Sequence, residues 1–201
     1  SAENVLGKVR DLPKTTYEGL KFALNLALWG NKMDLSLWPA TNGDPQDVLS
    51  EILDAAESNL LADDSNVVAE FCQDIQHVHI IVDNAGLELV TDLALAQYLI
   101  ESGTATTVTF QVKAHPTFVS DALDYDVRDT IQYYMNCDGT KYPNCVQAGL
   151  RWQTFLKNGQ WKIQPDFFWV QPFAMWDMTE PLRSEMRETC DLAIVKGDAN
   201  Y

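Results

Sequence analysis

Apolar residues recur at every third or fourth position in the first part of the chain, which is the spacing of one face of an α-helix. Residues 17–29 and 46–60 follow this pattern and are predicted to be helical. Residues 39–45 lie between them and are rich in Pro, Asn, Gly and Asp, so we expect a loop there. Residues 64–66 break the second helix, and a short helix is expected to follow as far as Cys72. Residues 1–72 are therefore interpreted as an N-terminal helical portion.

From residue 73 onward, short apolar or β-branched runs alternate with helical segments. Strands are predicted at residues 78–82, 106–112, 161–163 (an edge strand) and 192–195 (a last buried strand). Helices are predicted at residues 87–102, 125–137, 146–158 and 181–189. Strands that alternate with helices at this spacing imply right-handed βαβ units and a parallel sheet. We therefore expect an α/β fold in which residues 73–201 form a Rossmann-like three-layer α/β/α core.

Polar clusters follow three of the predicted strands. They are Asp83-Asn84-Ala85-Gly86, Ser120-Asp121 and Lys196-Gly197-Asp198-Ala199-Asn200-Tyr201. In open parallel sheets, ligands bind beyond the carboxyl ends of the strands. We therefore expect the three clusters to meet at one edge of the sheet.

The residue types in these clusters suit a metal ion and an anion. Carboxylate and amide oxygens are hard ligands for Mg²⁺, Mn²⁺ and similar ions, so Asp83, Asn84 and Asp121 are the predicted ligands. Gly86 permits close backbone approach where the chain enters a helix, whose N-terminal N–H groups attract anions. Lys196 is predicted to neutralise a phosphate oxygen. The implied chemistry is metal-assisted phosphoryl transfer to water or to a carboxylate, with Asp83 and Asp121 as the catalytic residues.

Simpler interpretations of the same residues stay open. Asp83 and the Ser120-Asp121 pair are also suited to cap the helices that follow them. The segment that starts at Lys196 is also typical of a turn. The two histidines at positions 77 and 79 share one face of a strand, but they lie at its start, away from the expected site. His115 lies closer to Asp121. It is a better candidate than these two histidines but a weaker one than the residues at the strand ends.

Charge and composition exclude several classes of function. The formal net charge is −15, which argues against nucleic acid and other polyphosphate backbones. A phosphorylated substrate must then be attracted locally. No GxGxxG or GxxxxGK[ST] motif supports a dinucleotide or P-loop site. The apolar runs are too short to span a bilayer and no secretory signal is visible, so we expect an intracellular protein without a membrane partner, in the cytoplasm, with the nucleus left open. The four cysteines are expected to be reduced, although Cys137 and Cys145 flank a loop and would pair if oxidised.

Four motifs, in order along residues 17–201, resemble the DUF89 (damage-control phosphatase, ARMT1-like) family. Residues 28–36 resemble LWGN(K/R)CDLS, residues 83–93 resemble a DN(A/S)G segment with a Glu-containing helix, residues 115–121 resemble PWFVSD with Thr117 in place of Trp, and residues 196–201 match KGDxNYR up to its last residue. The resemblance implies a metal-binding catalytic domain with the metal at Asp83, Asn84 and Asp121. It also implies a substrate pocket. Its predicted lining residues, together with those named from the strand ends, are Asp83, Asn84, Glu88, Ser120, Lys196, Asp198, Asn200, Asn31 and Asp34.

The resemblance further implies an enzyme that removes phosphate from small metabolites such as fructose 1-phosphate and fructose 6-phosphate, with Mn²⁺, Co²⁺ or Ni²⁺ as cofactor and Mg²⁺ as an alternative. The same branch is associated with an S-adenosylmethionine-dependent protein carboxyl methyltransferase activity, which is the alternative function. The sequence stops inside KGDxNYR and lacks the Arg and a later RTxK motif. We therefore expect a shortened chain that keeps the metal and holds phosphate less firmly, and a truncated non-catalytic module is a third interpretation.

Overall fold

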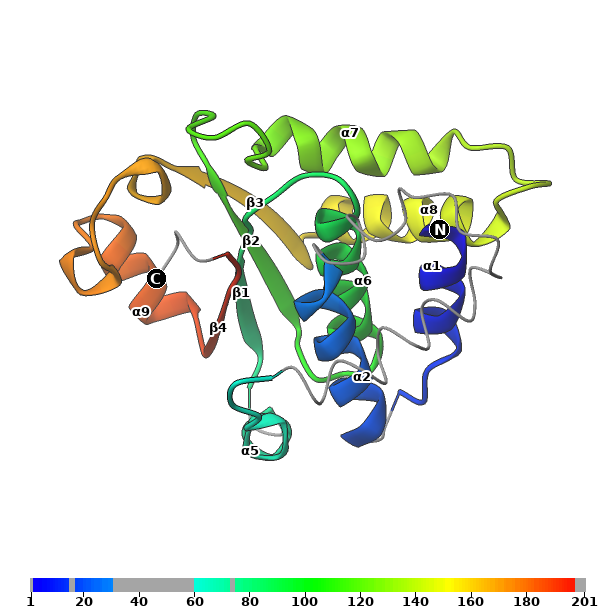
Figure 1. The fold of residues 1–201 in the computed structure, drawn as a ribbon, viewed down its shortest axis with the longest axis horizontal. Helices are drawn as coiled ribbons and strands as arrows, with labels where there is room; N and C mark the ends of the chain where they lie inside the picture. Colours follow the sequence, from blue (N-terminus) through cyan, green and yellow to red (C-terminus); the bar gives the residue numbers. More distant parts are fainter. Residues whose placement is uncertain (1, 15–16, 31–59, 73–74, 198–201) are drawn as a thin grey trace.

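A four-stranded parallel sheet lies at the centre of the chain, which the computed structural model describes for residues 2–14, 17–30, 60–72 and 75–197. The strands are β1 (His77–Ile81), β2 (Thr107–Lys113), β3 (Trp161–Asp166) and β4 (Leu192–Val195). Their order across the sheet is β3-β2-β1-β4, and every neighbouring pair is parallel. This confirms the predicted α/β class (Figure 1).

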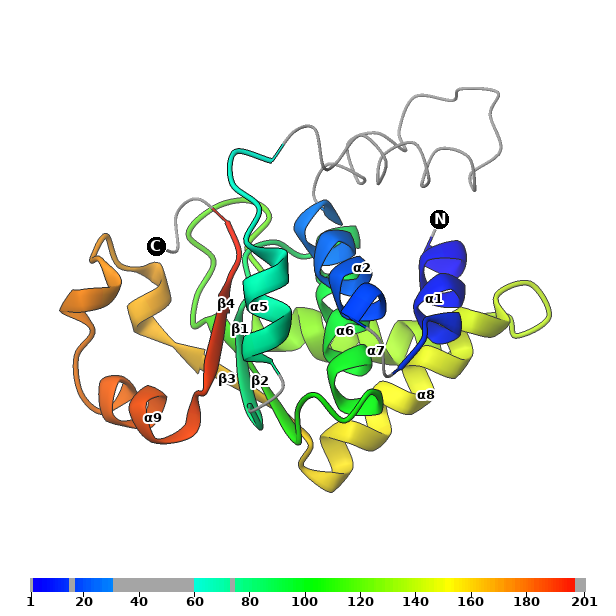
Figure 2. The ribbon, with the colours of Figure 1, turned by 90° about the horizontal axis from the view of Figure 1, so that it is seen from below.

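Helices cover both faces of this sheet. On one face lie α6 (Leu87–Glu101), α7 (Asp124–Met135) and α8 (Pro143–Asn158), which connect β1 to β2 and β2 to β3. On the other lie the short 3₁₀ helices η1 (Phe167–Val170) and η2 (Met175–Asp177) and the helix α9 (Leu182–Thr189), which connect β3 to β4 (Figures 1 and 2). Because the connection changes face between β3 and β4, β4 lies on the other side of β1 from β2.

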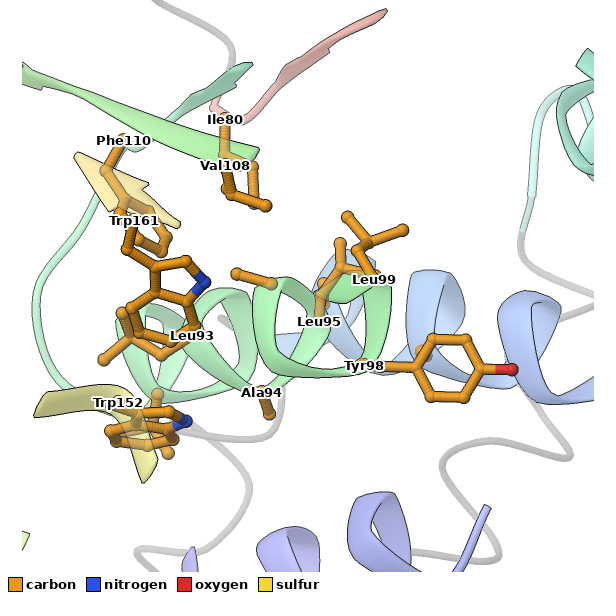
Figure 3. Packing of buried hydrophobic residues seen from close by; sticks show 14 of the residues in the cluster. Ile80, Leu93, Ala94, Leu95, Tyr98, Leu99, Val108, Phe110, Trp152 and Trp161 are labelled. Carbon is orange, nitrogen blue, oxygen red and sulfur yellow. The ribbon is translucent and has the colours of Figure 1, made fainter. Parts of the chain in front are cut away.

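The main core lies between the sheet and α6, α8 and α2. Strand residues alternate in direction, so Ile80 packs toward α6 whereas Ile81 belongs to a smaller cluster with Phe168 and Leu182 on the opposite face. Figure 3 shows the side chains of α6 among those of the strands, with Trp152 and Trp161 one above the other at one end. Their ring centroids are 6.2 Å apart. The helix α6 is buried along almost its whole length, because the sheet covers one side of it and α1, α2 and α8 pack around the rest.

Three further helices precede the sheet: α1 (Ala2–Asp11), α2 (Tyr17–Leu28) and α5 (Ser65–Phe71). The helix α1 was not predicted, because its polar residues obscure a stripe of three buried apolar ones. Glu3 of α1 accepts hydrogen bonds from the backbone N–H groups of Asn144 and Cys145 at the start of α8, both at 3.0 Å. The buried residues of α1 and α2 join the same cluster as the sheet. The division of the chain at residue 72 stays a prediction.

Other predictions can be compared with these elements. The predicted elements from residue 77 onward all occur, with ends shifted by a few residues. The strand at 192–195 was expected to be buried but is half-buried, since among the described residues β1 is its one strand neighbour. The predicted helix at 46–60 and the loop at 39–45 lie outside the described residues. The four cysteines form no disulfide, and within the described ranges no helix is both long and apolar enough to cross a membrane.

Candidate metal centre

The segments that follow β1 and β2 pair with each other at the carboxyl edge of the sheet. Asn84 and Asp121 face each other as an isolated antiparallel β-bridge. The N–H of Ala85 donates to the carbonyl of Ser120 at 2.8 Å, and the N–H of Ala122 donates to the carbonyl of Asp83 at 2.9 Å. The bridge therefore brings together the three predicted metal ligands, which come from two separate loops.

Lys113, the last residue of β2, lies between the two carboxylates of this group. Its Nζ is 3.0 Å from Oδ1 of Asp83 and 2.7 Å from Oδ1 of Asp121. Burial opposes the charged form of Lys113, but the hydrogen bonds to Asp121 and Asp83 outweigh it and raise its pKa. We had not predicted this residue, although its place at the carboxyl end of a strand is a signal that could have found it.

Asp121 is the more deeply buried of the two carboxylates, with 1% of its side chain exposed against 16% for Asp83. Its Oδ2 accepts hydrogen bonds from the backbone N–H groups of Thr117 and Phe118, both at 2.7 Å. Burial alone would raise the pKa of Asp121, but Lys113 and these N–H groups lower it below the ordinary value. Asp121 is therefore a carboxylate held ionised, and Asp83 is the more exposed of the two.

The side-chain amide of Asn84 connects three groups. Its Nδ2 donates to Oδ2 of Asp83 at 2.7 Å and to Oε2 of Glu88 at 3.0 Å, while its Oδ1 accepts from Oγ of Ser120 at 2.6 Å. Glu88 is 4% exposed, and Ser120 is exposed. The amide nitrogen thus faces the carboxylates of Asp83 and Glu88, and the amide oxygen faces Ser120.

Gly86 explains how Glu88 comes so close to Asn84. Its φ of 78° lies in the region that side chains disfavour, and it lets the chain turn at once from the end of β1 into α6. Glu88 is then in the first turn of the helix. The positive end of the α6 dipole is directed toward the same edge of the sheet.

The segment after β4 also reaches this site. Gly197 has a φ of 80°, and a Cβ built on it would lie 2.7 Å from Oδ1 of Asp83 and closer still to the rest of that carboxyl group. Only a glycine fits this approach. The three strand ends therefore meet where the strand order reverses, between β1 and β4, which is the usual ligand position in such sheets.

Lys196, directly before Gly197, is directed into the protein. Its Nζ is 2.7 Å from Oδ1 of Asp92 and 3.4 Å from Oε1 of Glu88, and it donates to the carbonyl of Ala27 at 2.8 Å. Burial opposes the charged form of Lys196, but Asp92 and Glu88 outweigh it and raise its pKa. The predicted contact of Lys196 with phosphate stays a prediction. Asp92 was not predicted as a site residue, although it lies one helical turn after Glu88.

The charges of this group do not balance. The contacts above join four carboxylates, those of Asp83, Glu88, Asp92 and Asp121, to the two ammonium groups of Lys113 and Lys196. Their formal charge is −2, the charge that one divalent cation would neutralise. Each side-chain oxygen of Asp83, Asn84 and Asp121 has a hydrogen-bond partner within the protein. These are hard oxygens, which suit Mg²⁺ or Mn²⁺. The residues therefore fit a divalent metal ion in their net charge and in their ligand type, and Lys113 is the one positive charge in contact with the ligand carboxylates described here.

The other candidate residues lie apart from this group or outside the described ranges. His79 is buried on the opposite face of the sheet, with Nε2 3.0 Å from the carbonyl oxygen of Thr189, and Nδ1 of His77 is 2.8 Å from Oγ1 of Thr107. No cluster of three or more His, Cys, Asp or Glu residues suited to a metal occurs in the part of the chain that the structure describes. An amide as the third ligand is compatible with that finding. Four predicted pocket residues lie outside the described ranges: Asn31, Asp34, Asp198 and Asn200.

Comparison with known proteins places this chain in a family. Residues 1–201 match the damage-control phosphatase ARMT1-like domain. The chain is 36% identical over 192 residues to damage-control phosphatase ARMT1 of Danio rerio, which covers 89% of this chain and 42% of that protein. For the Homo sapiens protein of the same name the identity is 31% over 212 residues, covering 99% and 47%. The chain thus spans less than half the length of these relatives. It belongs to the damage-control phosphatase ARMT1-like domain family.

Proposed function

We propose that this domain is a metal-dependent phosphatase that hydrolyses small phosphorylated metabolites, with sugar phosphates such as fructose 1-phosphate and fructose 6-phosphate as its first candidates. One observation carries the proposal: Asp83, Asn84 and Asp121 belong to a connected group of side chains with a formal charge of −2 at the carboxyl edge of the sheet. The names of the relatives support the phosphatase class. The sugar phosphates come from the family resemblance.

Asp83, Asn84 and Asp121 would hold the metal ion. Mn²⁺, Co²⁺ and Ni²⁺ are the candidates from the family resemblance, and Mg²⁺ is a further one from the oxygen ligands. A bound divalent cation supplies charge neutralisation for the phosphoryl oxygens and makes a water molecule more acidic. These effects compensate for the strongly acidic chain, which would otherwise repel a phosphate.

The protein side chains divide the remaining work. Asp121, held by Lys113 and two backbone N–H groups, keeps a fixed position. Asp83 is more exposed and faces the substrate. In the reaction, the bond between phosphorus and the sugar oxygen breaks, the oxygen of water forms the new bond to phosphorus, and a proton reaches the sugar oxygen. Ser120, Glu88 and the predicted residues Asn31, Asp34, Asp198 and Asn200 would surround the substrate.

Hydrolysis assays on the metal-stripped chain test this proposal. We expect p-nitrophenyl phosphate and fructose phosphates to be hydrolysed when Mn²⁺, Co²⁺, Ni²⁺ or Mg²⁺ is restored, and not before. Asp83→Asn should lose this activity. Asp138→Asn is the matched control, because Asp138 caps a turn between α7 and α8 and makes local hydrogen bonds to Thr140. If the chain binds Mn²⁺ but hydrolyses none of these substrates with any of the four metals, the result would favour a non-catalytic domain.

Thermal unfolding separates the phosphatase from the methyltransferase that the same resemblance implies. A ligand that binds only the folded state raises the melting temperature. We expect Mn²⁺ with phosphate to raise it and S-adenosylmethionine to leave it unchanged. The opposite result would favour the methyltransferase.

A further inference from the structure

We propose that Asp92 and Lys196 are positioning residues that fix Glu88 and, through it, the side-chain amide of Asn84. The contacts described for these two residues are with each other, with Glu88 and with the carbonyl of Ala27. Asn84, Glu88 and Asp92 are spaced four residues apart, and Lys196 joins the last two from the end of β4. The inference is that these two residues orient the side-chain amide of Asn84. That this orientation affects metal binding rests on the proposed function.

Burial explains why Lys196 must have these partners. An ammonium group removed from water is stable only if carboxylates and carbonyls replace its hydration. Asp92 is 0% exposed and uses one oxygen for Lys196, whereas its Oδ2 has no hydrogen-bond partner. A carboxylate buried in this way serves Lys196 rather than a ligand. The carbonyl of Ala27 in α2 holds the same ammonium from a third direction.

Glu88 transmits this arrangement because its two oxygens have different partners. Its Oε1 lies 3.4 Å from Nζ of Lys196, and its Oε2 accepts the hydrogen bond from Asn84 at 3.0 Å. With Oε1 attracted by Lys196, Oε2 is directed toward the loop after β1. If Lys196 were absent, the hydrogen bond from Asn84 would be the one side-chain contact described here that still restrains the Glu88 carboxylate.

The orientation of the Asn84 amide decides what it can bind. Its two ends have nearly the same shape, but one donates hydrogen bonds and the other accepts them. Glu88 and Asp83 accept from the nitrogen, which leaves the oxygen toward Ser120 and the site. An amide that rotated by half a turn would present N–H groups to a cation and repel it. Lys196 therefore acts on Asn84 through Glu88, and Asp92 acts on it through Lys196 and Glu88.

This role differs measurably from a direct contact between Lys196 and phosphate. If Lys196 bound phosphate, its removal would weaken substrate binding and leave metal affinity nearly unchanged. If Lys196 positions Glu88, its removal weakens metal binding, and the removal of Asp92 does the same although Asp92 is remote from any substrate.

The test uses Asp92→Asn, Lys196→Met and the double variant. The double variant removes one charge of each sign, so the net charge of the core is unchanged and Glu88 keeps its hydrogen bond from Asn84. It carries the test if either single variant fails to fold. Gln97→Met is the matched control, because Gln97 is a buried polar residue of the same helix that accepts a hydrogen bond from Trp152 at 2.8 Å.

The first readout is solvent exchange of the Asn84 side-chain amide protons, measured by NMR on the metal-free protein, with the signals identified by their loss in Asn84→Ala. We expect at least tenfold faster exchange in the double variant and no change in Gln97→Met. The second readout is calorimetry with Mn²⁺ alone, in which the dissociation constant should rise at least tenfold in the double variant only.

Amide exchange in the double variant that matches wild type would overturn the inference. If wild type itself binds no Mn²⁺, the proposed function fails, and the exchange rates of the Asn84 amide still decide the inference by themselves.

Discussion

Nζ of Lys113 lies 2.7 Å from Oδ1 of Asp121, and both side chains are almost completely buried, with 3% and 1% exposed. The same ammonium is 3.0 Å from Asp83. A positive charge thus occupies the space between the two carboxylates that are expected to bind the metal. Lys113 neutralises part of their charge in the metal-free protein, and a divalent cation would be repelled by it.

Replacing Lys113 by methionine separates these two effects. Lys113→Met leaves two neighbouring carboxylates without their counter-ion, so the metal-free variant should lose about 3–5 kcal/mol in free energy of unfolding. Saturating Mn²⁺ should then raise the melting temperature more in the variant than in wild type, because the cation replaces the missing charge. Calorimetric unfolding with and without Mn²⁺ measures both. An equal rise in the two proteins would show that the cation does not bind next to Lys113.

The three proposed ligands should contribute unequally. Asp83→Ala and Asp121→Ala each remove a charged oxygen ligand and should abolish Mn²⁺ binding in isothermal calorimetry. Asn84→Ala removes a neutral ligand and should weaken binding about tenfold, or about 1.4 kcal/mol. Full Mn²⁺ affinity in both aspartate variants would refute the assignment.

Gly197→Ala tests whether the segment after β4 sets the position of Asp83. The new methyl group would be forced against the Asp83 carboxyl group, so Mn²⁺ affinity should fall together with stability. Gly159→Ala is the control, since Gly159 has a similar φ of 81° but nothing within 4 Å of its Cβ position. Both variants should lose about 1–2 kcal/mol of stability from backbone strain. An equal loss of Mn²⁺ affinity in both variants would show that backbone strain, and not the contact with Asp83, weakens metal binding.

The buried carboxyl of Asp92 makes stability depend on pH. Burial raises its pKa from an ordinary value of 3.8 to about 6, although Lys196 opposes this. Between about pH 6 and pH 4 the folded protein therefore holds a proton on Asp92 that the unfolded chain has lost. This contribution to stability grows as the pH falls through 6 and is complete below the unfolded pKa.

Asp92→Asn should lack this contribution. Urea unfolding of the metal-free proteins measures this contribution. From pH 7 to pH 4.5, the free energy of unfolding of wild type should rise by about 2 kcal/mol relative to that of the variant. Other titrating groups are common to both proteins and cancel in the comparison. Parallel pH profiles would mean that Asp92 keeps an ordinary pKa in the folded state.

Much of the sheet could be predicted from the sequence. Short apolar runs such as that at β1 cannot form stable helices, and their alternation with long helical segments leaves a parallel sheet as the common solution. The position of Asp83, Asn84 and Asp121 at the ends of two strands follows from this order. The half-buried state of β4 could not be predicted, since the burial of a strand depends on its neighbours in the sheet and not on its own residues.

The sequence by itself determined the strand order along the chain, the three clusters at the strand ends and the residue types suited to a metal. Only the tertiary structure decided which charges pair. Lys113 meets Asp83 across 30 positions, and Lys196 meets Asp92 across 104. The physical reason is that a buried charge takes the partner that the folded backbone brings within hydrogen-bond distance. Hydrophobic periodicity carries no information on that choice. The place of Lys113 at a strand end could have marked it as a candidate, but its pairing with Asp83 and Asp121, and that of Lys196 with Asp92, follow only from the folded chain.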